Sequence, residues 1–196
     1  MMRGMSVEVV PATVDRWPAL EKVMGTPGDP PACWCQVFRH PREDWDARSV
    51  AQNRADLQAL VTGGRTPGLV AVDGDEPVGW VSVAPLSEMA RLVDSPWLAE
   101  ARAEDEDLSG RWVVTCFVVR ESARGSGLLA RLLEAAVEHA RGAGATALEA
   151  FPLDPNEAPE VDPDTLFAGT VEEYLRRGFV VRGGLQGHRV LVVRDL

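Results

Sequence analysis

Cysteine is scarce in this chain of 196 residues, which has only Cys33, Cys35 and Cys116. A small, odd number excludes a disulfide framework and is typical of proteins in a reducing compartment. Cys33 and Cys35 form a C-x-C-x4-H pattern with His40, but a structural zinc ion needs four ligands and no second cluster completes the set. We therefore expect no metal site. We interpret Cys116, which lies in an apolar run, as a buried small hydrophobe.

Long apolar runs are also absent. The charge-free run from Trp112 to Val119 has eight residues, whereas a helix that spans a bilayer needs about 20. The N-terminal stretch MMRGMSVEVV has no apolar core before Glu8, so it does not resemble a secretory signal. We expect a cytoplasmic protein with no membrane partner.

Basic residues are fewer than acidic residues, 20 against 30, and the formal net charge is -10. This balance excludes a nucleic-acid-binding groove and favours cationic partners such as amines. The length and the 45% apolar content allow one substantial core, so we expect a single domain over residues 1–196.

The patterns that are present predict a mixed α/β domain. Strands are expected at 6–13, at two runs within 67–85 around Asp73-Gly74, and at 112–119, 146–153, 179–183 and 188–193. Helices are expected at 14–24, 42–64, 127–141 and 170–178, and an irregular acidic insert with helical pieces at 87–109. The run 112–119 is apolar on both faces, which indicates a central strand. The sum is a largely antiparallel sheet of six to seven strands with helices on both faces.

A Gly-rich turn, RGSG at residues 124–127, lies between the central strand and the long helix. The N-terminus of a helix presents unpaired backbone N–H groups, and glycine lets the backbone approach an anion closely. Arg124 adds charge and Ser126 adds a hydroxyl group. The turn therefore predicts a pyrophosphate site, although a strand-to-helix loop that only needs flexible geometry is an alternative.

Residues 125–130 also match the dinucleotide pattern G-x-G-x-x-A, and Glu149 lies about where a ribose-binding acid would fall. Four residues and Arg124 separate the strand from the first glycine, and the downstream chain is too short for a doubly wound sheet. An NAD-binding oxidoreductase is therefore less favoured.

The stretch V-x-x-x-x-R-G-S-G from Val119 to Gly127 resembles motif A of the GNAT N-acetyltransferase superfamily. The stretch YLRRGF, from Tyr174 to Phe179, is similar to the family's C-terminal signature. The stretches CWCQVFR, PVGWVSVAP, VTCFVV and LEAFPLD resemble a bacterial branch of these proteins. Two positions depart from the family pattern: Leu129 leaves less room near the phosphates, and Phe167 replaces an asparagine that contacts the cofactor.

The resemblance implies the GNAT acyl-CoA N-acyltransferase fold, with acetyl-CoA as co-substrate and a primary amine of a small molecule or peptide as acceptor. It implies that the backbone of Phe117, Val118 and Val119 binds the pantetheine arm and the acyl carbonyl, with the Phe117 N–H stabilising the oxyanion. The residues implied at the phosphates are Arg124, Gly125, Ser126, Gly127, Leu128, Leu129 and Ala130.

The resemblance also implies that Tyr174, the only tyrosine, donates a proton to the leaving thiolate. Its alternative is a core tyrosine. Glu149 is the best remaining carboxylate for a general base, with a solvent-facing strand acid as the alternative. Trp34, Cys35 and Phe38 would line the acceptor site. A non-catalytic acyl-CoA-binding regulatory module is the rival function, and the superfamily contains both monomers and homodimers.

Overall fold

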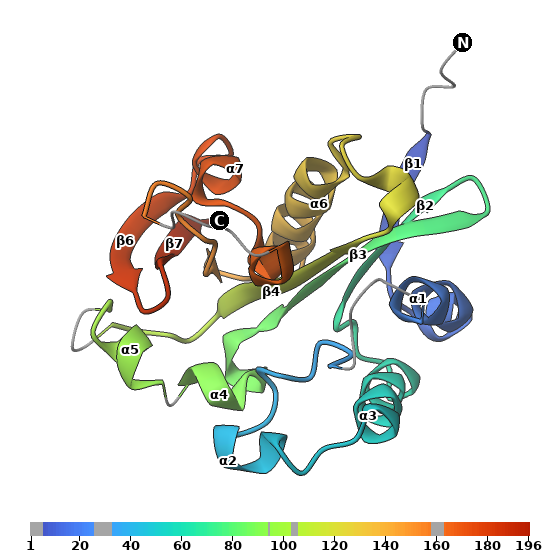
Figure 1. Cartoon of the computed structure of the whole chain (residues 1–196), viewed down its shortest axis with the longest axis horizontal. Helices are drawn as coiled ribbons and strands as arrows, with labels where there is room; N and C mark the ends of the chain where they lie inside the picture. Colours follow the sequence, from blue (N-terminus) through green and yellow to red (C-terminus); the bar gives the residue numbers. More distant parts are fainter. Residues whose placement is uncertain (1–5, 26–32, 94, 103–105, 158–162) are drawn as a thin grey trace.

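The structure is a computed structural model that describes residues 6–25, 33–93, 95–102, 106–157 and 163–196. Its centre is a seven-stranded sheet in the order β1-β2-β3-β4-β5-β7-β6 (Figure 1). The strands are β1 (Val7–Pro11), β2 (Gly68–Asp73), β3 (Glu76–Pro85), β4 (Arg111–Val119), β5 (Ala147–Ala150), β6 (Val180–Leu185) and β7 (Arg189–Asp195). Only β4 and β5 pair in parallel; the other five pairings are antiparallel. The predicted fold class is confirmed.

Helices cover both faces of the sheet (Figure 1). One face carries α6 (Leu128–Gly142) and α7 (Val171–Leu175). The other carries α1 (Trp17–Met24) and α3 (Val50–Thr62) towards one end, and α4 (Ala90–Val93) and α5 (Pro96–Ala99) towards the other, with the short α2 (Arg42–Trp45) beside them. The 3-10 turns are η1 (Val14–Arg16), η2 (Leu86–Glu88), η3 (Glu121–Ala123) and η4 (Pro163–Ala168). None of the helices in the described segments is long and apolar enough to cross a membrane.

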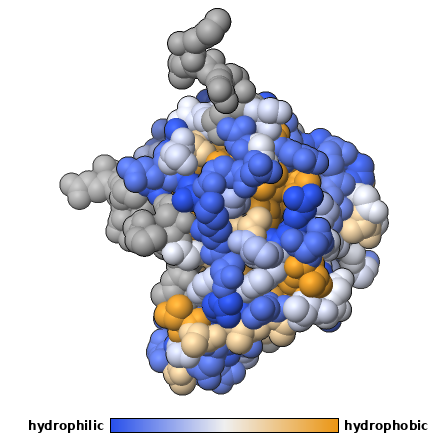
Figure 2. Space-filling model, turned by 90° about the vertical axis from the view of Figure 1, so that its right-hand side faces the viewer, coloured by the Kyte–Doolittle hydropathy of each residue, from blue (hydrophilic) through white to orange (hydrophobic). Residues whose placement is uncertain are grey.

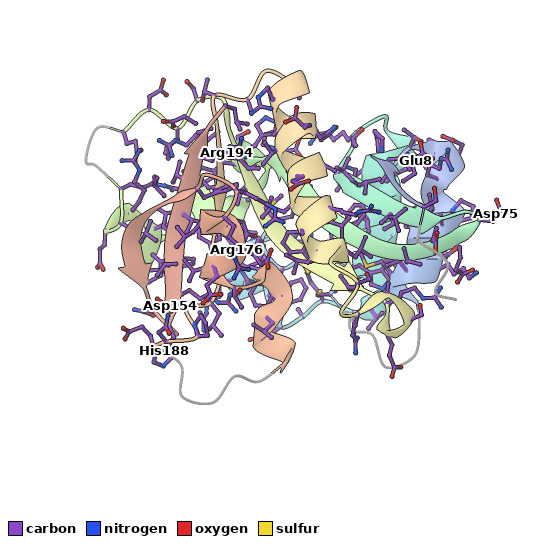
Figure 3. All side chains as sticks on the ribbon, turned by 90° about the horizontal axis from the view of Figure 1, so that it is seen from above. Glu8, Asp75, Asp154, Arg176, His188 and Arg194 are labelled. Carbon is purple, nitrogen blue, oxygen red and sulfur yellow. The ribbon has the colours of Figure 1, made fainter. Side chains whose placement is uncertain are left out.

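The apolar stripe predicted for the long helix explains how α6 is held. Leu132, Leu133 and Ala136 are fully buried and pack with Val81 and Val114 of the central strands in one core cluster. Seen from above, α6 crosses the sheet between the side that bears Glu8 and the side that bears Arg194 (Figure 3). The face that bears β1 is mostly hydrophilic, with hydrophobic side chains showing between polar ones (Figure 2).

The predicted continuous helix over residues 42–64 is wrong, because the chain forms α2 and then restarts as α3. Ser49 caps the second helix: its hydroxyl accepts from the Gln52 N–H at 3.3 Å, and the Gln52 side chain accepts from the Ser49 N–H at 2.8 Å. This capping box satisfies N–H groups that a continuous helix would bond internally.

Strand β5 is shorter than predicted, and this opens the sheet. The pairing of β4 with β5 runs only from Arg111 to Val114, whereas the pairing of β4 with β3 continues to Val119. The register between β3 and β4 shifts at Ser82, which leaves Thr115 as an extra residue on β4; its buried hydroxyl donates to the Ser82 hydroxyl at 2.9 Å. A bulge bends its strand and increases the local twist. The two parallel strands therefore diverge beyond Val114.

Candidate active site

The Gly-rich turn is exposed at the N-terminus of α6. Gly125 and Gly127 adopt φ of 73° and 79°, the left-handed region that disfavours other residues, and a Cβ at either position would meet no atom within 4 Å. The N–H groups of Leu128, Leu129 and Ala130 lie in the first turn of a 15-residue helix and have no intrahelical acceptor. Ser126 donates its hydroxyl hydrogen to the Ala123 carbonyl at 2.6 Å. The turn thus fits the diphosphate of a nucleotide. The space around the two glycines is open, the backbone N–H groups of the first helical turn lack intrahelical acceptors, and the helix dipole favours negative charge at this end.

Strand β4 leads into this turn with Phe117, Val118 and Val119, whose recorded strand partners all lie on β3. Phe117 is buried in the cluster under α6, whereas Val118 packs on the opposite face with α1 and α3. The flank of β4 that faces away from β3 lacks β5 beyond Val114. The predicted cofactor-binding backbone therefore lies at the divergence of the strands.

Tyr174 lies in the same core cluster as Phe117 and is fully buried. Its hydroxyl donates to the Ala168 carbonyl at 2.9 Å, and its ring meets Phe179 edge-on at 5.1 Å. Burial raises the pKa of Tyr174, nearby Cys116 adds to the rise, and Arg189 opposes it. The phenol is therefore protonated at neutral pH, and its hydrogen is already donated to the Ala168 carbonyl.

The turn and Tyr174 are brought together through Gly169. A Cβ on Gly169 would lie 3.5 Å from the Leu129 side chain and 3.8 Å from the Tyr174 ring. Arg177 of the segment after α7 also lies 3.5 Å from Glu134 of α6. Leu129, the departure from the motif, thus packs towards the tyrosine.

Glu149 occupies a different environment from the one we expected for a general base. It is fully buried, and its two carboxylate oxygens bind Arg102 and Arg111, the latter at 2.6 Å. Its neighbours on β5, Leu148 and Ala150, belong to the cluster under α6. Because side chains alternate along a strand, Glu149 points to the opposite face from Tyr174. Neither oxygen is available to an amine, so we leave Glu149 out of the proposed reaction.

The three residues expected at the acceptor site do not lie together: Trp34 and Cys35 are in one core cluster and Phe38 packs against another. Trp34 and Cys35 are 6% exposed and adopt positive φ; Trp34 stacks on Trp17 at 6.2 Å between ring centroids. A hydrogen bond with Cys116 and burial raise the pKa of Cys35, which is therefore a protonated thiol. Phe38 instead reaches η4 and lies 6.2 Å from the ring of Phe167. Cys35 thus lies against Cys116 of β4, in the cluster that holds Val118, whereas Phe38 lies towards η4; residues 26–32 lie outside the described residues.

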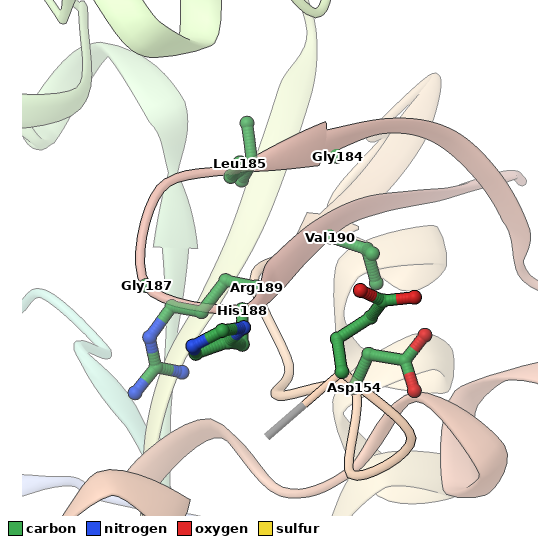
Figure 4. A pocket seen from close by; sticks show the side chains of 8 residues that line it. Asp154, Gly184, Leu185, Gly187, His188, Arg189 and Val190 are labelled. Carbon is green, nitrogen blue, oxygen red and sulfur yellow. The ribbon is translucent and has the colours of Figure 1, made fainter. Parts of the chain in front are cut away.

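The sequence patterns did not indicate Arg189. Its guanidinium lies 4.1 Å from the centroid of the Phe167 ring, and Nη1 donates to the Phe151 carbonyl at 2.9 Å. Arg189 also lines a cavity of about 490 Å³ at the β6–β7 turn, with His188 beside it and Asp154 elsewhere in the lining (Figure 4). The sequence signal that could have drawn attention to Arg189 is a charged residue at the start of the apolar run RVLVV. The sequence analysis noted Phe167 only because it replaces an asparagine of the family pattern. In the structure its ring packs against the Arg189 guanidinium.

The sequence model described as the acetyltransferase (GNAT) family matches residues 33–159, which are 127 of the 196 residues. The chain belongs to the GNAT acetyltransferase family. The resemblance seen in the motifs is thereby confirmed, and acetyl-CoA is the co-substrate of this family. Among the described residues, no group of three or more His, Cys, Asp or Glu side chains could hold a metal ion.

Solved structures agree on the fold. An acetyltransferase from Thermus thermophilus is 18% identical, with all of both chains covered and a TM-score of 0.51. PaiA N-acetyltransferase from Thermoplasma acidophilum, solved with coenzyme A, is 10% identical over 98% of this chain and 100% of that one, with a TM-score of 0.53. YncA from Salmonella typhimurium, solved with its cofactor acetyl-CoA, is 16% identical over 97% and 94%, with a TM-score of 0.54. No curated protein matches the chain significantly.

Proposed function

We propose that this GNAT protein is an N-acetyltransferase that moves the acetyl group of acetyl-CoA directly to a primary amine. The observation that carries the proposal is the exposed turn of Gly125 and Gly127 at the α6 N-terminus, immediately beyond the divergence of β4 and β5. The residues that would hold the co-substrate are those of the turn and the backbone of 117–119. The YncA structure, which holds acetyl-CoA on the same fold, supports this placement.

When bound, acetyl-CoA supplies a thioester whose C–S bond breaks as the amine nitrogen forms the new C–N bond. The departing sulfur needs a proton, and Tyr174 is a protonated phenol next to Leu129 of the cofactor turn. Its hydroxyl would exchange the Ala168 carbonyl for the sulfur. The proton lost by the amine goes to water in this scheme, because both oxygens of Glu149 are bound to arginines.

The test is a coenzyme A release assay with a panel of primary amines, comparing wild type with Tyr174→Phe. We expect kcat to fall about 100- to 10,000-fold, the range for loss of a general acid. Phe179→Leu is the control, since it disturbs the same ring contact without removing the hydroxyl. Coenzyme A binding with no turnover on any amine would contradict the proposal and favour the regulatory module. A Tyr174→Phe variant as active as the Phe179→Leu control would remove Tyr174 from the mechanism.

A further inference from the structure

The three cysteines of the chain, Cys33, Cys35 and Cys116, gather beside β4. Cys35 is 6% exposed and belongs to the core cluster under α1 and α3, and Cys116 packs against that cluster. All three are free thiols. Cys116, which we interpreted as a buried small hydrophobe, is half-buried, as is Cys33. The proposed acetyl transfer uses none of these thiol groups.

The thiols are linked to one another and to the strand of the proposed active site. A hydrogen bond with Cys35 and burial raise the pKa of Cys33, and a hydrogen bond with Cys116 raises the pKa of Cys35. Cys33 and Cys35 therefore keep their protons, and the Cys116 sulfur is the acceptor at the end of the series. Cys116 itself donates to the Phe117 carbonyl at 3.6 Å. The series thus ends on the backbone that is proposed to bind acetyl-CoA.

A buried indole N–H group lies beside the same thiols. Trp80 is fully buried, and its Nε1 has no hydrogen-bond partner. The indole lowers the pKa of Cys35 against the larger effect of Cys116, so it lies next to that thiol. Trp80 also lies diagonally across from Cys116 on one face of the β3–β4 pair, because Trp80 pairs with Val118. A thiol is a weak acceptor, so an oxygen atom added to one of these sulfurs would satisfy the indole N–H.

Cys116 is the thiol that a small oxidant would reach first. It lies on the part of β4 beyond Val114, where β5 no longer covers the flank of the strand. Cys33 is also half-buried, but it keeps its proton, and the thiolate is the form that reacts. Cys35 is too buried to be attacked from solvent but lies against Cys116, which is the position of a resolving thiol.

We propose that Cys116 is a modification site that hydrogen peroxide oxidises, and that Cys35 then forms a disulfide with it. In the first step one peroxide oxygen bonds to the Cys116 sulfur as the O–O bond breaks, and the thiol proton leaves with the other oxygen as water. In the second step the Cys35 sulfur displaces the oxygen of this sulfenic acid, which leaves as water with the Cys35 proton. Two thiols are oxidised and one peroxide is reduced. Transient disulfides of this kind are typical of redox-sensing proteins in a reducing compartment.

The disulfide affects acetyl-CoA because of the place of Cys116 on β4. It would remove the S–H group that donates to the Phe117 carbonyl and would tie β4 to the segment that holds Cys35. We therefore expect the oxidised protein to bind acetyl-CoA at least about tenfold more weakly than the reduced protein. This consequence rests on the proposed function, whereas the disulfide rests only on the cysteine cluster.

The experiment treats the full chain with hydrogen peroxide, blocks the remaining thiols with N-ethylmaleimide and maps tryptic peptides by mass spectrometry. Cys35 and Cys116 lie on different peptides, residues 23–39 and 112–120. Wild type is compared with Cys35→Ser, Cys116→Ser and a matched control, Cys33→Ser, which removes the other cysteine of the first peptide. A disulfide between the two peptides should form in wild type and in the control, and in neither of the other variants. In Cys35→Ser, dimedone, a reagent for sulfenic acids, should label Cys116.

Three results of this mapping would overturn the site. They are a disulfide within residues 23–39 in place of the link to Cys116, loss of the link in Cys33→Ser, and complete alkylation of Cys116 after peroxide. Dimedone labelling of Cys33 instead of Cys116 in Cys35→Ser would overturn the assignment of Cys116 as the first thiol oxidised.

Isothermal titration with acetyl-CoA gives the separate readout, before peroxide, after peroxide and after dithiothreitol. In wild type the affinity should fall on oxidation and return on reduction, and in Cys116→Ser peroxide should change it by less than about twofold. Equal affinity of reduced and oxidised wild type would overturn the effect on acetyl-CoA while the disulfide stands. If reduced wild type does not bind acetyl-CoA, the proposed function fails and the disulfide again stands.

Discussion

Replacement of Glu149 by glutamine separates a structural role from a catalytic one. The carboxylate is fully buried between Arg102, 6% exposed, and Arg111, 11% exposed. Glutamine keeps the shape but removes the charge, so Arg102 is left without its recorded acidic partner, whereas Arg111 retains Glu106. Breaking a buried ion pair by removing one partner destabilises a protein by about 3–5 kcal/mol. We expect a loss near the lower end of this range, about 3 kcal/mol, because one arginine keeps a carboxylate.

The assay is urea denaturation of Glu149→Gln and wild type at pH 7, followed by tryptophan fluorescence. The control is Glu8→Gln on the edge strand β1, where the side chain is exposed and lies far from Arg194 of β7 (Figure 3). A surface substitution of this kind changes stability by at most about 0.5 kcal/mol. Acetyl transfer by the folded fraction of Glu149→Gln should stay within about twofold of wild type, since no proton moves through this residue.

A stable Glu149→Gln variant, within about 1 kcal/mol of wild type, would refute the energetic reasoning. A folded variant whose kcat falls about 100-fold would refute the structural role and restore Glu149 as the general base.

Two further outcomes follow from burial and packing. Because the folded pKa of Tyr174 is raised, kcat should show no descending limb up to pH about 10, the usual pKa of tyrosine. The free energy of unfolding should fall as pH rises above that value, because the tyrosine of the unfolded chain ionises first; below it, the contribution of this phenol to stability is fully present. A pH–rate profile measures the first effect and alkaline denaturation measures the second. A descending limb of kcat near pH 8 would contradict the buried phenol. Gly68→Ala should destabilise the protein by about 3 kcal/mol or more, because its Cβ would lie 2.1 Å from the Val81 carbonyl oxygen and 2.5 Å from the Trp80 ring; thermal unfolding unchanged from wild type would show that β2 and β3 can move apart.

The sequence predicted the elements whose signals are local. The hairpin of β2 and β3 follows from Asp73-Gly74, and Gly74 adopts φ of 62°. The stripe of leucines predicted α6 to within a residue at each end. The helix break was also present in the sequence, as the S-x-x-Q capping box at Ser49, but the apolar spacing across it concealed the signal.

The site could be predicted only where one motif carries it. The turn at 124–130 is contiguous, so its residues and exposure follow from the sequence. Glu149 depends on Arg102 and Arg111, which lie 47 and 38 residues away, and no pattern on β5 announces them. Cys116 of β4 likewise meets Cys35 only in the folded chain. Burial and charge pairing across such separations arise from the packing of the fold, not from local propensity.

The central claim is that the turn before α6 binds acetyl-CoA, and Gly127→Ala with Gly144→Ala as its matched control tests it most directly. Both glycines adopt left-handed φ, 79° and 82°, and neither Cβ would meet an atom within 4 Å, but they flank opposite ends of α6. Each substitution should therefore destabilise the fold equally, by about 1–2 kcal/mol. In isothermal titration with acetyl-CoA, we predict at least about tenfold weaker binding for Gly127→Ala and wild-type affinity for Gly144→Ala. Equal affinity in the two variants would contradict the account.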